Sequence, residues 1–249
     1  MVIVTVANQK GGVAKTTTAV ALAHGLALWG YNTLLIDFDP QGQCAAYLGV
    51  EQESCVFHLL IGASRLPQVV RQTGRDRLWL VPGDKRTSSA QTVLVAEGYD
   101  KSLLSGILHN GYVDSSKLHF VILDTAPSVG GIQEMALYTA DILLIPTAVD
   151  FLALDGVAKV LQSLQALRRP SPPLTRLLPT FFDETTKESQ RNLDVLRKKF
   201  PTAVLPPIHR AAVLREAPAE GKTIFEYAPR SRSAQEYRVL VQEVVNVAS

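Results

Sequence analysis

The sequence has few cysteines and no long apolar run, and these two absences narrow the kinds of protein it can encode. Only two cysteines, Cys44 and Cys55, occur in 249 residues, which argues against a secreted scaffold held by disulfides and favours a reducing compartment. No apolar stretch approaches the roughly 20 residues that cross a bilayer. The first residues also lack a charged segment followed by a small-residue cleavage site, so we expect a cytoplasmic protein.

The composition indicates a chain with a substantial core. Hydrophobic residues make up 47% and charged residues 19%, which excludes a disordered or acidic-tail protein. A length of 249 residues suits one large α/β domain or at most two small ones. The segment 168–173 (RRPSPP) is too short for a domain linker, so we expect a single domain over residues 1–249.

Basic residues are concentrated in the last third of the chain. Residues 1–167 carry 11 Lys or Arg and 14 Asp or Glu, whereas residues 168–249 carry 14 and 9. The first part therefore has a formal charge of −3 and the second of +5, which hints at a basic face. Charge that falls on solvated helix faces would explain the same numbers.

Short apolar runs alternate with helical patterns along the chain. We expect strands at residues 2–7, 33–36, 78–81, 120–123, 142–145, 177–181 and 203–205. We expect helices at residues 16–28, 101–108, 154–167, 189–200 and 233–247. Continuous apolar strands that alternate with helices predict an α/β fold with a mostly parallel, twisted sheet and helices on both faces.

A phosphate-binding loop is predicted at residues 9–18 (QKGGVAKTTT), between the first strand and the first helix. Phosphate oxygens need several backbone N–H groups, and a helix N-terminus adds its positive dipole end. Gly11 and Gly12 let the backbone approach closely. Lys15 would neutralise the β- and γ-phosphates, Thr16 would ligate Mg²⁺ and Thr17 would reach the α-phosphate. Val13 and Ala14 complete the loop.

Ala14 departs from the usual pattern of such loops. Gln9 and Ala14 stand where G-x-x-x-x-G-K-[ST] has glycines. If the loop needs a positive φ at Ala14, its Cβ costs on the order of 1 kcal/mol. We expect this to weaken nucleotide binding without abolishing it.

Carboxylates follow two of the predicted strands. Asp37 and Asp39 lie in LLIDFDPQGQ (34–43), and Asp124 ends the apolar run of VILDTAPS (121–128). Ligand sites gather at the carboxyl ends of strands in open α/β sheets. Asp124 has the pattern of a Walker B aspartate, which would hold Mg²⁺ through water. The sequence therefore predicts a nucleotide–magnesium site at this edge.

These motifs resemble those of the ParA/MinD family of dimerising ATPases. Residues 10–17 are similar to the deviant loop K-G-G-x-G-K-[ST]-[ST], and 34–42 to L-L-[IV]-D-x-D-P-Q-G. Residues 178–183 (LPTFFD) and 206–229, with Glu216-Ala217-Pro218, Gly221, Tyr227 and Pro229, resemble further segments of the small, Soj-like ParA partition ATPases. The resemblance covers nearly the whole chain and implies a SIMIBI-type P-loop fold.

The resemblance also implies roles for single residues. Lys10 would reach across a homodimer to the partner's phosphates, so that ATP joins two subunits. Asp39 would orient the attacking water, Asp37 would lie in the Mg²⁺ shell, and residues 125–131 (TAPSVGG) would form a switch that senses the γ-phosphate. Backbone near Pro206 and Pro207 would frame the adenine.

Partition ATPases bind DNA non-specifically, and here the match is incomplete. Thr185 and Val213 occupy positions where the family often has arginine. Basic residues that could replace these contacts are Lys187, Arg191, Arg197, Lys198, Lys199, Arg210, Arg215, Lys222, Arg230 and Arg232. The Lys198–Lys199 pair could equally be a solvated helix end.

The function predicted from the sequence is an ATP-driven positioning motor. Its ATP-bound dimer would coat the nucleoid, and a ParB-like or other adaptor would stimulate hydrolysis and release, with a plasmid, chromosome or protein organelle as cargo. The alternatives are a regulatory or scaffold protein with weak or no ATP turnover, and a metabolic P-loop ligase of the biotin-synthesis type. The tail 237–249 lacks the basic amphipathic pattern of the membrane-binding MinD branch. Iron–sulfur reductases share the deviant loop, but the single Cys44 and Cys55 are not the paired cysteines that a bridged cluster would need. The lack of an N-terminal helix-turn-helix argues against operator-specific repression.

Overall fold

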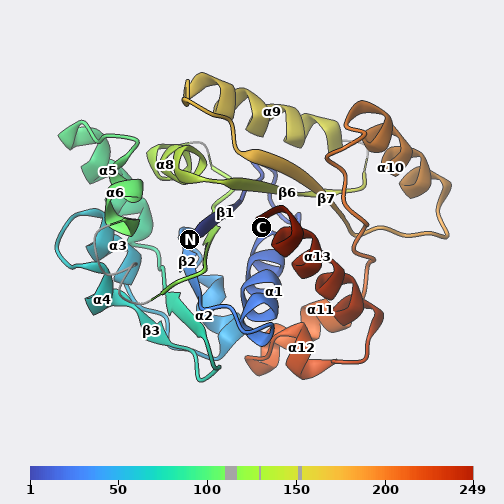
Figure 1. Cartoon of the computed structure of the whole chain (residues 1–249), viewed down its shortest axis with the longest axis horizontal. Helices are drawn as coiled ribbons and strands as arrows, with labels where there is room; N and C mark the ends of the chain where they lie inside the picture. Colours follow the sequence, from blue (N-terminus) through green and yellow to red (C-terminus); the bar gives the residue numbers. More distant parts are fainter. Residues whose placement is uncertain (110–116, 129, 151–152, 249) are drawn as a thin grey trace.

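The computed structural model describes residues 1–109, 117–128, 130–150 and 153–248, and its centre is a twisted seven-stranded sheet (Figure 1). The strands are β1 (Val2–Val6), β2 (Thr33–Asp37), β3 (Arg71–Gln72), β4 (Leu78–Val81), β5 (Phe120–Asp124), β6 (Ile142–Ala148) and β7 (Leu174–Thr180). Their order across the sheet is β3-β4-β2-β5-β1-β6-β7. All pairings are parallel except that of β3 with β4. The mostly parallel α/β fold predicted from the sequence is confirmed.

Helices cover both faces of this sheet. One face carries α1 (Lys15–Leu28), α2 (Gln43–Leu48), α12 (Ile224–Tyr227) and α13 (Arg232–Ala248). The other carries α3 (Cys55–Leu60), α4 (Leu66–Val69), α5 (Thr87–Glu97), α6 (Leu103–Leu108), α8 (Gly131–Thr139) and α9 (Ala153–Ala166), with α10 (Lys187–Lys199) packed beside α9 (Figure 1). The short α11 (Val213–Glu216) and the 3₁₀ turn η1 (Ala217–Glu220) precede α12.

The two faces follow from the alternation of side chains along each strand. In β2, Leu34 and Ile36 pack with the α3–α6 and α8 layer, whereas Leu35 packs with α1 and α13. In β5, Val121 packs with the α3–α6 and α8 layer, and Ile122 packs on the face of α1 and α13. Successive side chains of a strand point to opposite faces, so a strand buried on both sides is apolar throughout.

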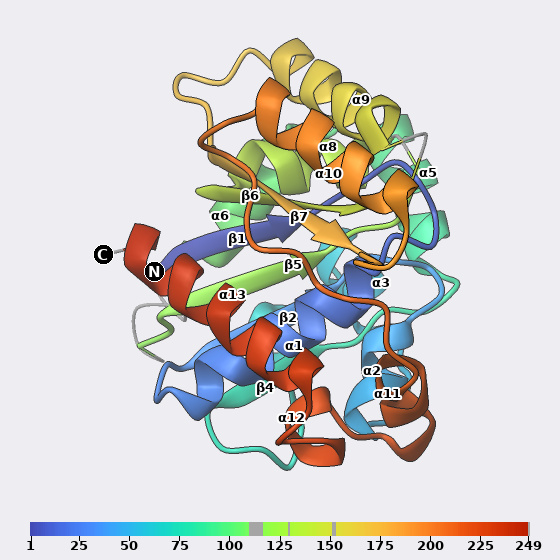
Figure 2. The same ribbon diagram turned by 90° about the vertical axis from the view of Figure 1, so that its right-hand side faces the viewer.

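Helices α1 and α13 pack against each other and cross in the view of Figure 2. Gly25 is the point of closest approach, because a Cβ built there would lie 2.4 Å from Cγ2 of Val241. The Tyr237 hydroxyl is fully buried and lies 3.5 Å from Oγ1 of Thr18. The helix that follows the phosphate-binding loop is therefore fixed by the C-terminal helix.

One predicted strand is wrong. Residues 203–205 form a single bridge, Leu177 to Val204, and no strand. Pro206 and Pro207 follow immediately and have no N–H with which to extend a ladder. Of the predicted switch 125–131, Val129 lies outside the described residues, and Gly131 already begins α8.

Within the described part of the chain, no helix combines the length and the apolar character that crossing a membrane requires.

Candidate nucleotide-binding site

The loop between β1 and α1 has positive φ angles, which the sequence alone could not establish. Gly12 has φ +70°, and Ala14 has φ 66° and ψ 35° directly before α1. A Cβ built at Gly11 or Gly12 would meet no atom within 4 Å, so the loop borders open space. Ala14 therefore has the positive φ that makes its Cβ unfavourable.

The two lysines of the loop lie in different surroundings. Lys15 is 6% exposed, and its ammonium donates to the carbonyl of Lys10 at 3.2 Å. Burial lowers the pKa of Lys15, and the carboxylates of Asp124 and Asp39 oppose that shift. The Lys10 ammonium instead donates to Oδ2 of Asp150, which follows β6, at 2.5 Å.

A cavity of about 370 Å³ opens in front of the loop. Its walls come from the loop and start of α1, the β2–α2 connection, α2, the β5–α8 loop, and the segments that follow β7. The lining residues are Gly11, Gly12, Val13, Ala14, Lys15, Thr16, Thr17, Asp39, Gln43, Tyr47, Pro127, Phe181, Arg210, Ala211, Leu214 and Arg215. All predicted loop residues from Gly11 to Thr17 thus face one space together with Asp39.

Asp37 and Asp124 lie side by side beneath this cavity. They are register partners in the parallel pair β2–β5, and both are fully buried. Asp37 accepts hydrogen bonds from the amides of Asp39 and Cys44 at 3.1 and 2.9 Å. Burial raises the pKa of Asp124 to about 6, with the Asp39 carboxylate adding to the shift, and burial also raises the pKa of Asp37.

Asp39 is oriented separately from this buried pair. Its Oδ1 accepts the amide of Gln41 at 2.9 Å, and the residue is half-buried at the rim of the cavity. Asp37 thus ends β2 and is buried, whereas Asp39, two residues further on, is half-buried.

The donor set fits a divalent cation. Oδ1 of Asp124 is buried and has no hydrogen-bond partner among the described residues, so it is available as a ligand. One ligand atom each of Asp37, Cys44 and Asp124 lies within 4.8 Å of the others. Carboxylate oxygens are preferred ligands of Mg²⁺. The Cys44 thiol donates to Asp124 at 3.4 Å, a contact that the sequence analysis missed although Cys44 is seven residues after Asp37.

Pro206 and Pro207 do not line the cavity, but the segment after them does. Arg210, Ala211, Leu214 and Arg215 form its wall, with the Arg210 guanidinium 5.8 Å from the Phe181 ring centroid. The structure thus brings two predicted DNA-binding residues to the nucleotide cavity. The sequence analysis missed Tyr47 and Phe181 as wall residues, because only the packing of α2 and β7 places them there.

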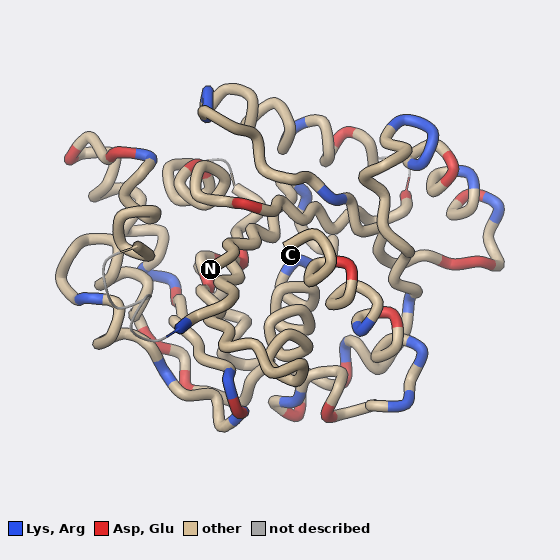
Figure 3. The backbone as a smooth tube through the Cα atoms, viewed as in Figure 1, with Lys and Arg blue, Asp and Glu red and all other residues tan. Residues whose placement is uncertain are grey.

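The remaining basic candidates are distributed over two regions. Lys187, Arg191, Arg197, Lys198 and Lys199 are exposed on α10, where Lys and Arg positions recur along the helix (Figure 3). Lys222 pairs with Glu220 at 2.8 Å, and Arg230 is exposed before α13.

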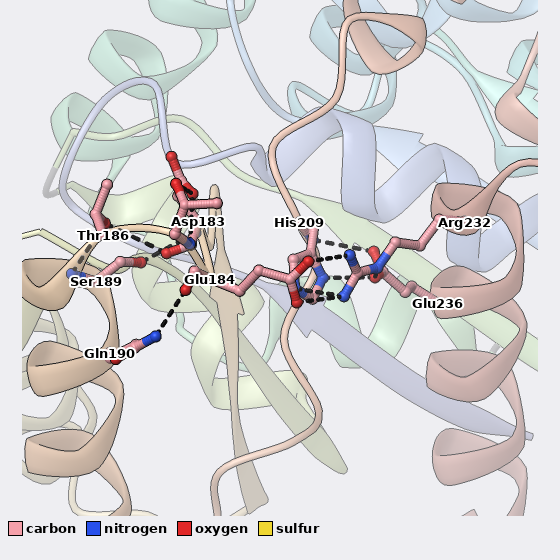
Figure 4. Close-up of polar contacts among 9 residues, drawn as sticks. Asp183, Glu184, Thr186, Ser189, Gln190, His209, Arg232 and Glu236 are labelled. Carbon is pink, nitrogen blue, oxygen red and sulfur yellow. Dashed lines mark hydrogen bonds and ion pairs between the residues drawn. The ribbon is translucent and has the colours of Figure 1, made fainter.

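Arg232 is engaged in a network of carboxylates (Figure 4). Its guanidinium bonds Glu184 at 2.9 Å and Glu236 at 2.9 Å. His209 joins the network, since its Nδ1 lies 2.6 Å from Glu236 and its Nε2 lies 2.7 Å from Arg232. Because the guanidinium can only donate, Nε2 accepts and the Nδ1–H donates to Glu236. The network ties the loop after β7 to α13 and offsets the charge of Arg232.

The fold and the site together define a P-loop nucleotide-binding protein with a departure in the loop's last glycine position. A family model described as an AAA domain matches residues 1–174. The chain is 37% identical to the chromosome-partitioning ATPase Soj of Thermus thermophilus, over 97% of this chain and 94% of that protein. The chain belongs to the ParA/MinD family of ATPases, as the sequence motifs predicted.

Two solved structures show the same architecture. Apo McdA of Cyanothece superposes with a TM-score of 0.87 at 23% identity, over 98% of this chain and 99% of that one. Cobyrinic acid a,c-diamide synthase of Mycobacterium smegmatis, bound to an ATP analogue and magnesium, has a TM-score of 0.81 at 25% identity, over 99% and 95% of the two chains.

Proposed function

We propose that the chain is an ATP-hydrolysing partition or positioning ATPase whose ATP-bound form is a homodimer. The observation that carries the proposal is the convergence of residues 11–17 and Asp39 on one cavity, above the buried pair Asp37 and Asp124. The Soj name of the 37% identical relative and the magnesium and ATP analogue bound by the 25% identical synthase support it. Residues 1–249 would act as one domain.

The loop would bind the phosphates, and the aspartates would bind the cation. The amides of Gly11 to Ala14 and the Lys15 ammonium would bind the phosphates of ATP, with Thr17 at the α-phosphate. Thr16, Asp37 and Asp124 would hold Mg²⁺, which neutralises phosphate charge when bound. Burial disfavours an isolated Lys15 cation, so phosphate oxygens are suitable partners for it.

Asp39 would orient the attacking water. Its carboxylate is fixed by the Gln41 amide at the rim of the cavity, where a water next to the γ-phosphate would lie. Catalysis of phosphoryl transfer consists mainly of positioning and electrostatic stabilisation, and a water-orienting group supplies the first of these.

Lys10 would stabilise the ATP-bound dimer by contacting the nucleotide of the partner subunit. In the monomer its ammonium is paired with Asp150, so it must leave this carboxylate before it can reach the partner's nucleotide. The pair is 30% and 47% exposed, and such pairs contribute little to stability. The exchange of Asp150 for phosphate oxygens would then couple ATP binding to dimerisation.

The dimer would bind DNA without sequence preference, mainly through α10, and so associate with the nucleoid in the cytoplasm. The +5 charge of residues 168–249 and the exposed lysines and arginines of α10 support this step. An adaptor of the ParB kind would stimulate hydrolysis and release. The cargo would be determined by that adaptor.

Two substitutions test the nucleotide site. Lys15→Ala should abolish ATP and ADP binding in a calorimetric titration. Asp39→Ala should keep ATP binding and form a dimer in light scattering, but should lose phosphate production. Hydrolysis at the wild-type rate by Asp39→Ala would contradict the assignment of Asp39.

A regulatory or scaffold protein with little turnover is the second candidate. The left-handed Ala14 favours it, because strain in the phosphate loop could weaken nucleotide binding. A wild-type chain that binds ATP and dimerises, yet releases no phosphate even with excess magnesium and DNA, would support this function over the first.

A further inference from the structure

A second cavity, of about 110 Å³, lies behind the wall of the nucleotide cavity. The two share a partition made of the β2–α2 connection and the β5–α8 loop. Asp39 and Pro127 face the nucleotide side, whereas Pro40, Ala126 and Ser128 face the second cavity. Direct sequence neighbours therefore line opposite sides of one thin wall.

The far side of this second cavity is formed by the first turns of two helices. Thr87 and Ser88 begin α5, and Ile132 and Gln133 lie in the first turn of α8. Neither helix has a side-chain cap on its N-terminus. The amides of Thr87 and Ser88 already donate to the carbonyls of Asp84 and Lys85, so α5 offers the cavity its side-chain hydroxyls. Both helix N-termini still carry partial positive charge, which favours an anion.

Two buried side chains add hydrogen-bonding groups that have no partner. Thr87 is 0% and Gln133 is 5% exposed, and both line the cavity. Oγ1 of Thr87 and Nε2 of Gln133 have no hydrogen-bond partner within the described ranges. An unpaired buried polar group is costly, so these atoms are suited to a guest that accepts hydrogen bonds.

The size and charge of the cavity restrict that guest. The space exceeds what one water molecule needs, and none of the described residues that line it carries a charged side chain. The nearby Asp84 does not line it and is already bonded to the amide of Arg86 and the hydroxyl of Ser54. A small tetrahedral oxyanion would fit this volume, accept hydrogen bonds from Thr87 and Gln133, and be favoured by the positive ends of the two helices.

We propose that this cavity is a transient site for the inorganic phosphate that hydrolysis releases, and that the phosphate leaves through the partition while ADP remains on the loop. The proposal rests on the proposed ATPase function for the source of the phosphate. Binding at the site involves only hydrogen bonds from the Thr87 hydroxyl and the Gln133 amide, together with the partial positive charge of the two helix ends, and no covalent bond is made or broken there. A neutral donor set binds the anion weakly, as a route of exit requires.

Kinetics can separate this site from the chemical step. In Gln133→Leu and in Thr87→Val, cleavage followed by rapid quench should keep its wild-type rate. Phosphate release, followed with a fluorescent phosphate-binding protein, should slow about tenfold, because one hydrogen bond to a charged group is lost. Thr92→Val, an exposed substitution on α5, is the matched control and should change neither rate.

Equal losses in cleavage and release would overturn the proposal, since the residues would then act on the chemical step. Unchanged release would also overturn it. Misfolding is checked by thermal unfolding, where Gln133→Leu should be no less stable than wild type, because its amide nitrogen has no partner to lose.

Direct binding tests the site even if the ATPase function fails. In Lys15→Ala, where the phosphate loop is disabled, millimolar inorganic phosphate should still broaden its ³¹P resonance. The broadening should disappear when Gln133→Leu and Thr87→Val are added. No broadening in Lys15→Ala itself would refute the site, whatever the turnover of the wild-type chain.

Discussion

Ala14 shows how a single residue can set the properties of the phosphate loop. Its left-handed backbone is the conformation in which a Cβ lies too close to the following carbonyl, and no side-chain cap compensates at the start of α1. The cost is local and lies where the nucleotide would bind.

Ala14→Gly should therefore raise the free energy of unfolding. Relief of the left-handed conformation outweighs the larger entropy of an unfolded glycine, and we expect a gain of about 0.5–1 kcal/mol. Urea unfolding measures it. Ala96→Gly, on the exposed face of α5, is the control and should lose about 1 kcal/mol. A less stable Ala14→Gly would show that the loop is not strained.

Asp150→Asn should strengthen ATP-dependent dimerisation. The amide no longer holds the Lys10 ammonium. Each subunit would otherwise break one exposed ion pair of up to about 1 kcal/mol on dimerisation, so the dimer dissociation constant should fall by up to about 30-fold. Sedimentation velocity with ATP measures this constant. Asp155→Asn, which breaks the exposed pair with Lys159, should leave it unchanged. A weaker Asp150→Asn dimer would assign Asp150 to the interface instead.

At the scale of elements, the strands were more predictable than the helices. Strands buried on both faces are continuous apolar runs, so their positions were visible in the sequence. Helix α5 buries only Thr87, Ala90 and Leu94, and its pattern is too weak to detect. Helix α8 begins at Gly131, in a segment read as a loop, because packing against the sheet overrides the weak helix propensity of glycine.

The contact between α1 and α12 predicts a pH dependence of stability. Nδ1 of His24 lies 2.7 Å from Oγ1 of Thr223, and burial lowers the pKa of His24 to about 4. The ordinary pKa is about 6.5, so between these values the unfolded chain binds a proton that the folded chain does not. Stability should fall as pH drops from about 6.5 to about 4, by roughly 3 kcal/mol from this group.

Urea unfolding at pH 7, 5.5 and 4.5 measures this loss. Buried Asp37 and Asp124, with raised pKa values, act in the opposite direction, so the difference between wild type and His24→Asn isolates the histidine. The stability of wild type relative to His24→Asn should fall as the pH drops. His109→Asn, at an exposed histidine, should keep the wild-type slope. An identical slope in wild type and His24→Asn would rule out His24 as its source.

At the scale of the whole molecule, the sequence predicted which motifs form the nucleotide site but not all of its walls. Residues 11–17 and Asp39 share a cavity because parallel strands bring their carboxyl ends to one edge. Arg210 and Arg215 could not be placed, because their position depends on how the chain crosses that edge after β7. The roles of all these residues, and the single domain, stay predictions.

The charge distribution of the folded chain changes the expected DNA-binding surface. Arg210 and Arg215 line the nucleotide cavity, and Arg232 and Lys222 are paired with carboxylates. This leaves α10 as the main basic element. Charge reversal at Arg215 would therefore affect nucleotide and DNA together, so α10 is the better place for a test.

Lys198→Glu with Lys199→Glu should weaken binding of the ATP-loaded Asp39→Ala dimer to every DNA sequence alike. We expect at least a tenfold loss, and a salt dependence shallower by about 0.9 log units for each phosphate contact removed. Fluorescence polarisation with random duplexes measures both. Lys222→Glu is the control, and ADP should not support binding. Unchanged affinity in the α10 variant would refute α10 as the DNA-binding surface.

The pairing of β2 with β5 fixes the distance between the two carboxylates that are proposed to hold the cation. Asp37 and Asp124 are register partners, so their separation is set by the interstrand spacing of about 4.8 Å and not by any loop. Changes in the phosphate loop can then alter nucleotide affinity while the size of ion accepted stays constant. A one-residue slip of β2 would place an apolar neighbour, Ile36 or Phe38, opposite Asp124 in place of Asp37. Selectivity for the ion therefore depends on the correct strand register in the folded sheet.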